Sequence, residues 1–100
     1  MSLDLDEIIK ALAHPTRREI LHKLKNPDAH FADQHHSLEH GVCAGQIDQC
    51  CGLSQSTVSA HLATLQRAGL ISSKKVGQWH FFRRNEETLQ AFLRQMSQEL

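Results

Sequence analysis

The chain has 100 residues, 40% of them hydrophobic, and its 11 basic and 11 acidic residues leave no formal net charge. This size fits one small globular domain spanning 1–100, and no run of about 18 apolar residues could form a membrane span. The N-terminus lacks the basic and apolar regions of a signal peptide, so we expect a cytoplasmic protein. Three cysteines do not form the even set of a disulfide-stabilised secreted fold.

Two helices are predicted before residue 27. Asp4 with Glu7 is typical of a helix start, and an apolar stripe follows it. The second helix begins at Pro15, which suits a first helical position, and ends by Asn26. His14, just before it, is interpreted as structural. The positions expected to face solvent on the second helix are Arg17, Arg18, Lys23 and Lys25.

The polar stretch from Pro27 to Val42 is predicted to be a loop or a frayed helical turn. A connection this long is typically either mobile or functional. Imidazole and carboxylate groups suit zinc, nickel or copper, but the spacing matches no standard metal site, and a solvated connection is the alternative. The candidate ligands are His30, Asp33, His35, His36, Glu39, His40 and the nearby Cys43.

A helix-turn-helix is predicted over about 44–68. Its first helix ends near Cys51, Gly52 can adopt the positive φ of a turn, and Ser54 can cap the second helix. Apolar residues at 58, 62 and 65 mark the buried face of that helix, and Gly69 ends it. The opposite face carries short polar side chains, which can reach base edges in a DNA groove.

Two strands around Gly77, over about 70–84, predict a two-stranded hairpin, or wing. Alternation places Trp79 and Phe81 on one face and His80 on the other. No acidic residue occurs from 49 to 85, so the neutral total conceals a basic half, as phosphate binding requires. We therefore expect contact with double-stranded DNA from Ser54, Gln55, Ser56, Thr57, Ser59, Ala60, His61, Thr64, Lys74, Lys75, Gln78 and His80.

The first and last helices, about 4–13 and 86–98, carry more apolar residues than so small a domain needs, and Asn85 can cap the last one. A homodimer would bury this surplus. The expected interface residues are Leu5, Ile8, Ile9, Leu12, Leu89, Phe92, Leu93 and Met96.

The element order helix, helix, helix-turn-helix, hairpin, helix is mainly α with a β-hairpin wing. The sequence resembles the ArsR–SmtB family of bacterial repressors along nearly its whole length. The matching runs are Ala-Leu-Ala-His-Pro-Thr-Arg-Arg-Glu-Ile-Leu at 11–21, Leu-Ser-Gln-Ser-Thr-Val-Ser-Ala-His-Leu at 53–62, and Ala-Gly-Leu at 68–70 leading to Gly77-Gln78. The resemblance implies a winged helix-turn-helix homodimer, operator binding by the fourth helix and the wing, and repression relieved by an inducer.

Both metal sites familiar from that family are incomplete here. Arsenic and cadmium sensors carry Cys-Val-Cys in the third helix, where this chain has Cys43-Ala44-Gly45. Zinc sensors place Asp, His, His and Glu along the last helix, where this chain offers no histidine. We therefore expect no metal at these sites and no cofactor.

Three alternatives remain open for the inducer. A thiol switch at Cys43 or Cys50 is favoured over metal sensing but not over inert cysteines, and its basis is that a helix N-terminus can activate a cysteine. The histidine-rich connection is a second sensor candidate, and inert cysteines with an unknown small molecule are the third. No Ser-His-Asp arrangement, phosphate loop or catalytic carboxylate pair stands out, so we do not expect an enzyme. A protein-interaction module without DNA binding is the other function class, and the acid-free region favours DNA.

Overall fold

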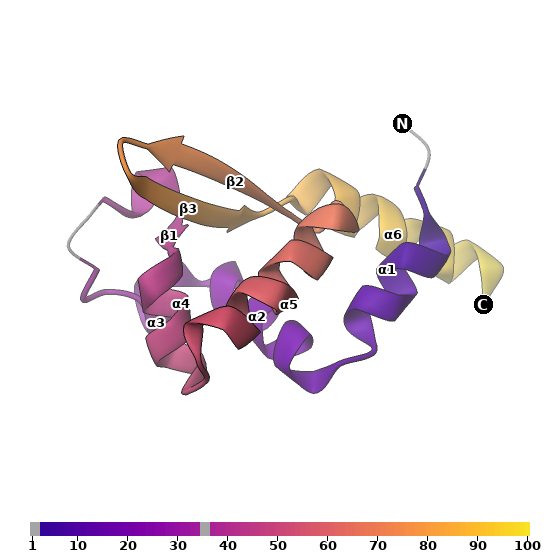
Figure 1. The fold of residues 1–100 in the computed structure, drawn as a ribbon. Coiled ribbons are helices and arrows are strands. Elements are labelled where there is room, and N and C mark those ends of the chain that lie inside the picture. Colours follow the sequence, from indigo (N-terminus) through magenta and orange to yellow (C-terminus); the bar gives the residue numbers. More distant parts are fainter. Residues whose placement is uncertain (1–2, 35–36) are drawn as a thin grey trace.

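Helices precede and follow a small antiparallel sheet in the computed structural model, which describes residues 3–34 and 37–100 (Figure 1). The first elements are α1 (Leu5–Leu12), α2 (Pro15–Lys25), α3 (Pro27–His30), the 3-10 turn η1 (Leu38–His40) and the strand β1 (Val42–Cys43). The helix-turn-helix consists of α4 (Ala44–Cys51) and α5 (Gln55–Arg67). Strands β2 (Ile71–Val76) and β3 (Trp79–Arg84) form the hairpin, and α6 (Glu86–Glu99) follows.

Side-chain caps set the starts of α1, α5 and α6, and His14 caps α2 through its Nδ1. Asp4, Ser54 and Asn85 each accept the N–H group three residues further on, at 3.1, 3.3 and 3.3 Å. Gly52 ends α4 with a φ of 64°, and its N–H group donates to the carbonyl of Asp48. The turn between α4 and α5 therefore has the backbone that its glycine predicts.

The sheet has three strands, in the order β1-β3-β2. Val42 pairs with Phe82 and Cys43 with Phe81, so β1 covers the edge of β3 that a two-stranded wing would leave open. The sequence prediction of a two-stranded hairpin was incomplete, because a strand of two residues carries no alternation to detect. The fold is nevertheless the predicted winged helix.

The core lies between α1, α2, α4, α5, α6 and the base of the sheet. Phe31 and Val42 belong to it, although both fall in the stretch predicted as a loop. That stretch also contains α3 and η1, so much of it is ordered by contacts that the polar sequence does not reveal. None of the described helices combines the length and hydropathy needed to cross a membrane.

The residues predicted for a dimer surface divide into two groups. Ile8, Leu89 and Phe92 are at most 8% exposed and lie in the core of the protomer itself. By contrast, Ile9 and Leu93 are 47% and 55% exposed. The rest are half-buried: Leu5, Leu12 and Met96. The exposed apolar surface is therefore narrower than predicted, and α1 and α6 carry it at the end of the molecule away from the wing tip (Figure 1).

Candidate nucleic-acid interface

The outer face of α5 is exposed, polar and uncharged. Buried Val58, Leu62 and Leu65 anchor the helix from its inner side. At its start, the Ser54 hydroxyl donates to the Thr57 hydroxyl at 2.8 Å, which fixes two polar groups at the positive end of the helix. Over residues 54–60 the exposed ones are Ser54, Gln55, Ser56, Thr57, Ser59 and Ala60, all of which the sequence predicted as DNA contacts.

One face of the wing is turned towards α5. The Gln66 amide donates to the Ser73 hydroxyl at 3.0 Å, which fixes the position of β2. Residues two apart on a strand share a face, and so do antiparallel partners. Lys75 and its partner His80 therefore share the face of Ser73, whereas Lys74 lies on the opposite face with Phe81.

A groove of about 270 Å³ separates α5 from the wing. Gln55, Ser59 and Gln66 line it on the helix side, and His80 and Phe82 line it on the strand side. The helix and the wing thus form two walls of one groove, and Ala44, Leu62 and Ala63 add apolar surface to its polar side chains. Gln78, exposed in the turn of the hairpin, extends the wing wall.

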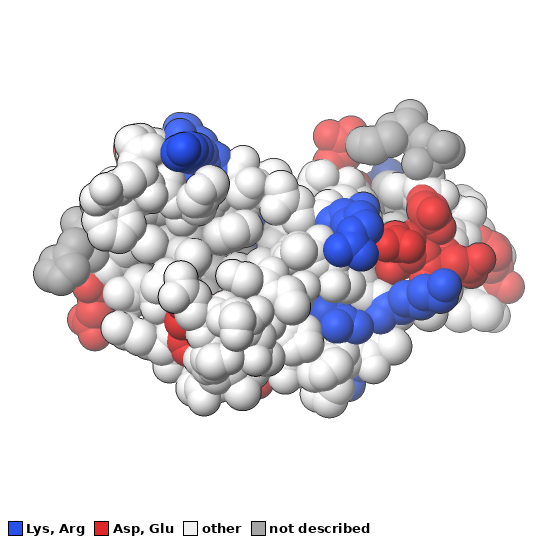
Figure 2. Space-filling view, in the orientation of Figure 1, with Lys and Arg blue, Asp and Glu red and all other residues white. Residues whose placement is uncertain are grey.

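Positive charge flanks this neutral surface. Figure 2 shows Lys and Arg side chains over the wing and near the C-terminal end of α5, with uncharged residues between them. The acidic side chains in this view lie mainly at the α1–α6 end. Uncharged polar groups with cations on both sides suit a duplex, whose base edges lie between two phosphate backbones.

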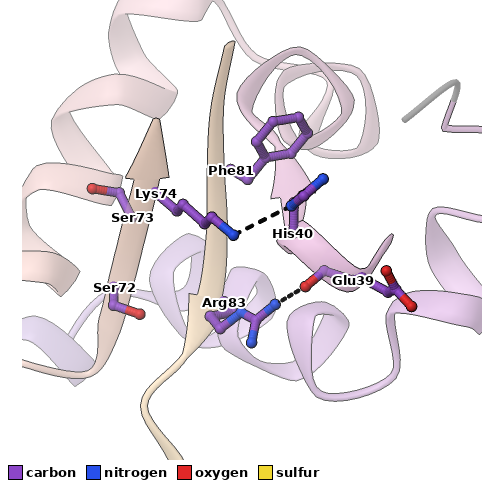
Figure 3. Close-up of a pocket in the computed structure, with 7 residues that line it drawn as sticks. All are labelled: Glu39, His40, Ser72, Ser73, Lys74, Phe81 and Arg83. Atoms are coloured by element: carbon purple, nitrogen blue, oxygen red, sulfur yellow. Dashed lines mark hydrogen bonds between the residues drawn. The ribbon is translucent and has the colours of Figure 1, made fainter. Parts of the chain in front are cut away.

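The other face of the wing is tied to η1 around a pocket of about 280 Å³ (Figure 3). Lys74 points to His40, with 3.4 Å between Nζ and Nδ1, and the Arg83 guanidinium donates to the Glu39 carbonyl. His40 also lies over Phe81, with ring centroids 5.5 Å apart. Both cations therefore have partners within the protein, and they hold the wing against the connection that precedes β1.

Two predicted DNA contacts on α5 have hydrogen-bond partners within the protein. The Thr64 hydroxyl donates to the Ala60 carbonyl at 3.1 Å, within the helix. His61 is half-buried, and its Nδ1 lies 3.3 Å from a guanidinium nitrogen of Arg17 on α2. Arg17, predicted to face solvent, is itself half-buried. The His61–Arg17 contact joins helices far apart in the sequence, so the local pattern could not indicate it.

The candidate metal ligands are dispersed. The His30 ring lies 6.1 Å from that of His22, and His40 is engaged by Lys74. Cys43 is buried in β1. Across residues 3–34 and 37–100, no three His, Cys, Asp or Glu side chains are placed to hold a metal ion. His35 and His36 lie outside the described residues.

All three cysteines are free thiols, in different surroundings. Cys43 is buried, so a thiol switch there would have to open the sheet edge, whereas Cys50 is half-buried at the end of α4. Burial raises the pKa of the Cys51 thiol, and its packing against the core agrees with its predicted role as a core residue. Lys23 reaches α4 by donating to the Cys50 carbonyl at 3.3 Å, and hydrogen bonding at Cys50 and to Glu19 raises the pKa of Lys23.

Fold and surface together define a winged helix-turn-helix with an exposed polar face on α5 beside the wing. Comparisons with known proteins agree. Residues 41–73 match the family model described as bacterial regulatory protein, arsR family. The chain is 41% identical over 86 residues to the uncharacterized HTH-type transcriptional regulator YbzH of Bacillus subtilis, covering 83% of this chain and 85% of that protein.

Two further relatives cover most of the chain. The transcriptional repressor SdpR of Bacillus subtilis is 31% identical, with 86% of this chain and 81% of that protein aligned. The solution structure of a homodimeric winged helix-turn-helix DNA-binding domain from Mycobacterium bovis, a possible ArsR-family regulator, superposes with a TM-score of 0.64 at 25% identity, covering 95% and 81% of the two chains. The chain belongs to the arsR family of bacterial regulatory proteins and is a DNA-binding transcriptional regulator of that type.

Proposed function

We propose that this protein is a dimeric repressor, acting in the cytoplasm, which binds a palindromic operator in double-stranded DNA and releases it in response to an inducer. The observation that carries the proposal is the exposed, uncharged polar face of α5 beside a basic wing, in a segment without acidic residues from 49 to 85. The similarity to a repressor, SdpR, supports the direction of regulation.

In this proposal α5 enters the major groove, with Gln55, Thr57 and Ser59 directed at base edges. A bidentate amide such as that of glutamine can distinguish adenine from the other bases. Lys75 and Gln78 approach the flanking phosphates or the minor groove. Phosphate contacts then position the protein, and the side chains of α5 select the sequence.

Dimerisation through α1 and α6 is supported by the exposed apolar side chains of Ile9 and Leu93 and by the homodimeric relative from Mycobacterium bovis. An isologous interface would place two copies of α5 symmetrically. Half-sites about 34–36 Å apart, one turn of the duplex, would then be read together.

The test is binding to duplexes selected from a random pool by the wild-type protein, followed by fluorescence anisotropy between about 50 and 200 mM salt. We expect a palindromic consensus and an affinity that falls steeply with salt. Gln55→Ala should change the selected sequence, while Gln90→Ala on exposed α6 should not. Selection of no duplex would refute DNA binding and favour a protein-interaction module.

The inducer can be assigned with the same assay. Release by a thiol oxidant would support a cysteine switch, and release by one equivalent of zinc would support the histidine-containing connection. The zinc response should then disappear when His35, His36 and His40 are replaced by Ala. If neither agent changes the affinity, a small molecule that binds elsewhere is the better account.

A further inference from the structure

His61 connects the recognition helix α5 to the junction between α1 and α2. Arg17 Nη1 lies 3.3 Å from His61 Nδ1, and the His14 and His61 rings have centroids 4.5 Å apart. His61 is half-buried there, so its imidazole contacts the protein. The sequence predicted His61 as a DNA contact, whereas its contacts in the structure indicate a role within the protein.

Arg17 joins three helices with one guanidinium group. Its Nε donates to the Ala11 carbonyl at 2.6 Å and its Nη2 to the Lys10 carbonyl at 3.0 Å, both in the last turn of α1. The Lys10 carbonyl also accepts from the N–H group of the C-cap residue Ala13 at 3.2 Å, so Arg17 is its second donor. Because the guanidinium is planar and rigid, fixing two of its nitrogens on α1 also fixes the nitrogen presented to α5.

The hydrogen bonds specify the protonation state of both imidazoles. Arg17 can only donate, so His61 Nδ1 must accept and its ring proton lies on Nε2. His14 is the N-cap of α2, and its Nδ1 accepts the Thr16 N–H group at 3.1 Å. Protonation of either Nδ1 would place its N–H group against the donor that it now accepts from, and on His61 it would also add a positive charge beside Arg17.

No negative charge offsets that addition among the described residues. The titratable groups that act on His61 are His14 and Arg17, while α1 presents backbone carbonyls to Arg17. The helix α4 and the strand β2, which also pack against α5, contribute no titratable group to this contact. Burial, and then the charges of His14 and Arg17, lower the pKa of His61.

We propose that Arg17 is a positioning residue for the recognition helix, and that it acts only on neutral His61, so that acid releases α5 from the α1–α2 junction and weakens operator binding. The inference rests on the proposed DNA-binding function. Since α1 carries the exposed Ile9 of the proposed dimer surface, Arg17 sets the angle between α5 and the dimer axis. Two recognition helices must match successive major grooves, so a small rotation at this contact weakens both half-site interactions.

The direction of the pH effect follows from the hydrogen bonds. The ordinary pKa of a histidine side chain is 6.5, and the pKa of His61 in contact with Arg17 is lower. The contact is therefore complete above about pH 6.5 and is lost as the pH falls through the lowered pKa of His61.

The test compares wild type with His61→Asn, whose amide oxygen can accept from Arg17 but does not titrate. The matched control is His22→Asn, an exposed histidine on α2. Affinity for a duplex selected by the wild type is measured at about pH 7.5 and about pH 5.5. Wild type and His22→Asn should lose on the order of fivefold more affinity on acidification than His61→Asn, the lower range of typical coupling between sites.

Two further measurements separate the possible failures. Arg17→Gln should bind more weakly at about pH 7.5 and should share the flat pH profile of His61→Asn. Ring ¹⁵N shifts, recorded without DNA, should show the Nε2–H tautomer of His61 and a protonation midpoint below the ordinary value of 6.5. The inference would be overturned if His61→Asn kept the wild-type pH profile or selected a different DNA sequence. An Nδ1–H tautomer of His61 in the wild type would overturn it as well. Failure of the wild type to select any duplex would refute the proposed function instead, while the ring shifts would still test the contact.

Discussion

Lys74 and Lys75 are adjacent in sequence but lie on opposite faces of the wing, and they should differ in their effect on DNA binding. Lys75 shares the α5 side with Ser73 and His80, whereas Lys74 is held against His40 on the other side. Each lost phosphate contact lowers the magnitude of the salt slope by about 0.9. A dimer of Lys75→Ala loses two such contacts, so its slope should fall by about 1.8.

This difference is large enough to measure by fluorescence anisotropy on one selected duplex. Raising the salt from roughly 50 to 200 mM should reduce the advantage of wild type over Lys75→Ala about twelvefold. Lys74→Ala, which removes the same charge one residue away, should change the slope by less than half as much. Equal losses in the two variants, or no loss in Lys75→Ala, would refute the assignment of the DNA-facing side of the wing.

Three further outcomes are expected. Gly41→Ala should lower the free energy of unfolding by about 1–3 kcal/mol and Tm by at least about 4 °C. The reason is that φ at Gly41 is 107° and the new Cβ would lie 2.6 Å from a carbonyl oxygen of β3. Gly45→Ala, whose Cβ would enter open space, should not lower Tm. In sedimentation, Leu93→Glu should give monomers and Gln90→Glu dimers, since a buried unpaired charge is costly; a stable Leu93→Glu dimer would place the interface elsewhere. If the inducer is an oxidant, diamide should release wild type but not Cys50→Ser from the operator, and equal release of both would exclude Cys50 as the sensor.

The helical part of this protein could be predicted from short segments of sequence. Asp4, Ser54 and Asn85 each cap a helix because their side chains reach an N–H group three residues away, a contact that depends on nothing else in the fold. Likewise, Gly52 adopts a positive φ because the turn itself requires it. The acid-free stretch and the polar face of α5 are properties of composition, so the DNA-binding class could be inferred as well.

Contacts between distant segments decided the rest. The strand β1 exists because β3 offers it an edge, and Phe31 is buried because the core closes over it. Neither event has a signature within a few residues.

The same limit applies to the functional surface. Alternation separates the two faces of the wing, but only the Gln66–Ser73 contact decides which of them lies towards α5, and with it the different environments of Lys74 and Lys75. His61 lies on the polar side of an amphipathic helix, yet it contacts Arg17, which is 44 residues away in the chain. Sequence periodicity thus determined the helices and the class of protein, whereas tertiary packing determined which polar side chains remain available to DNA.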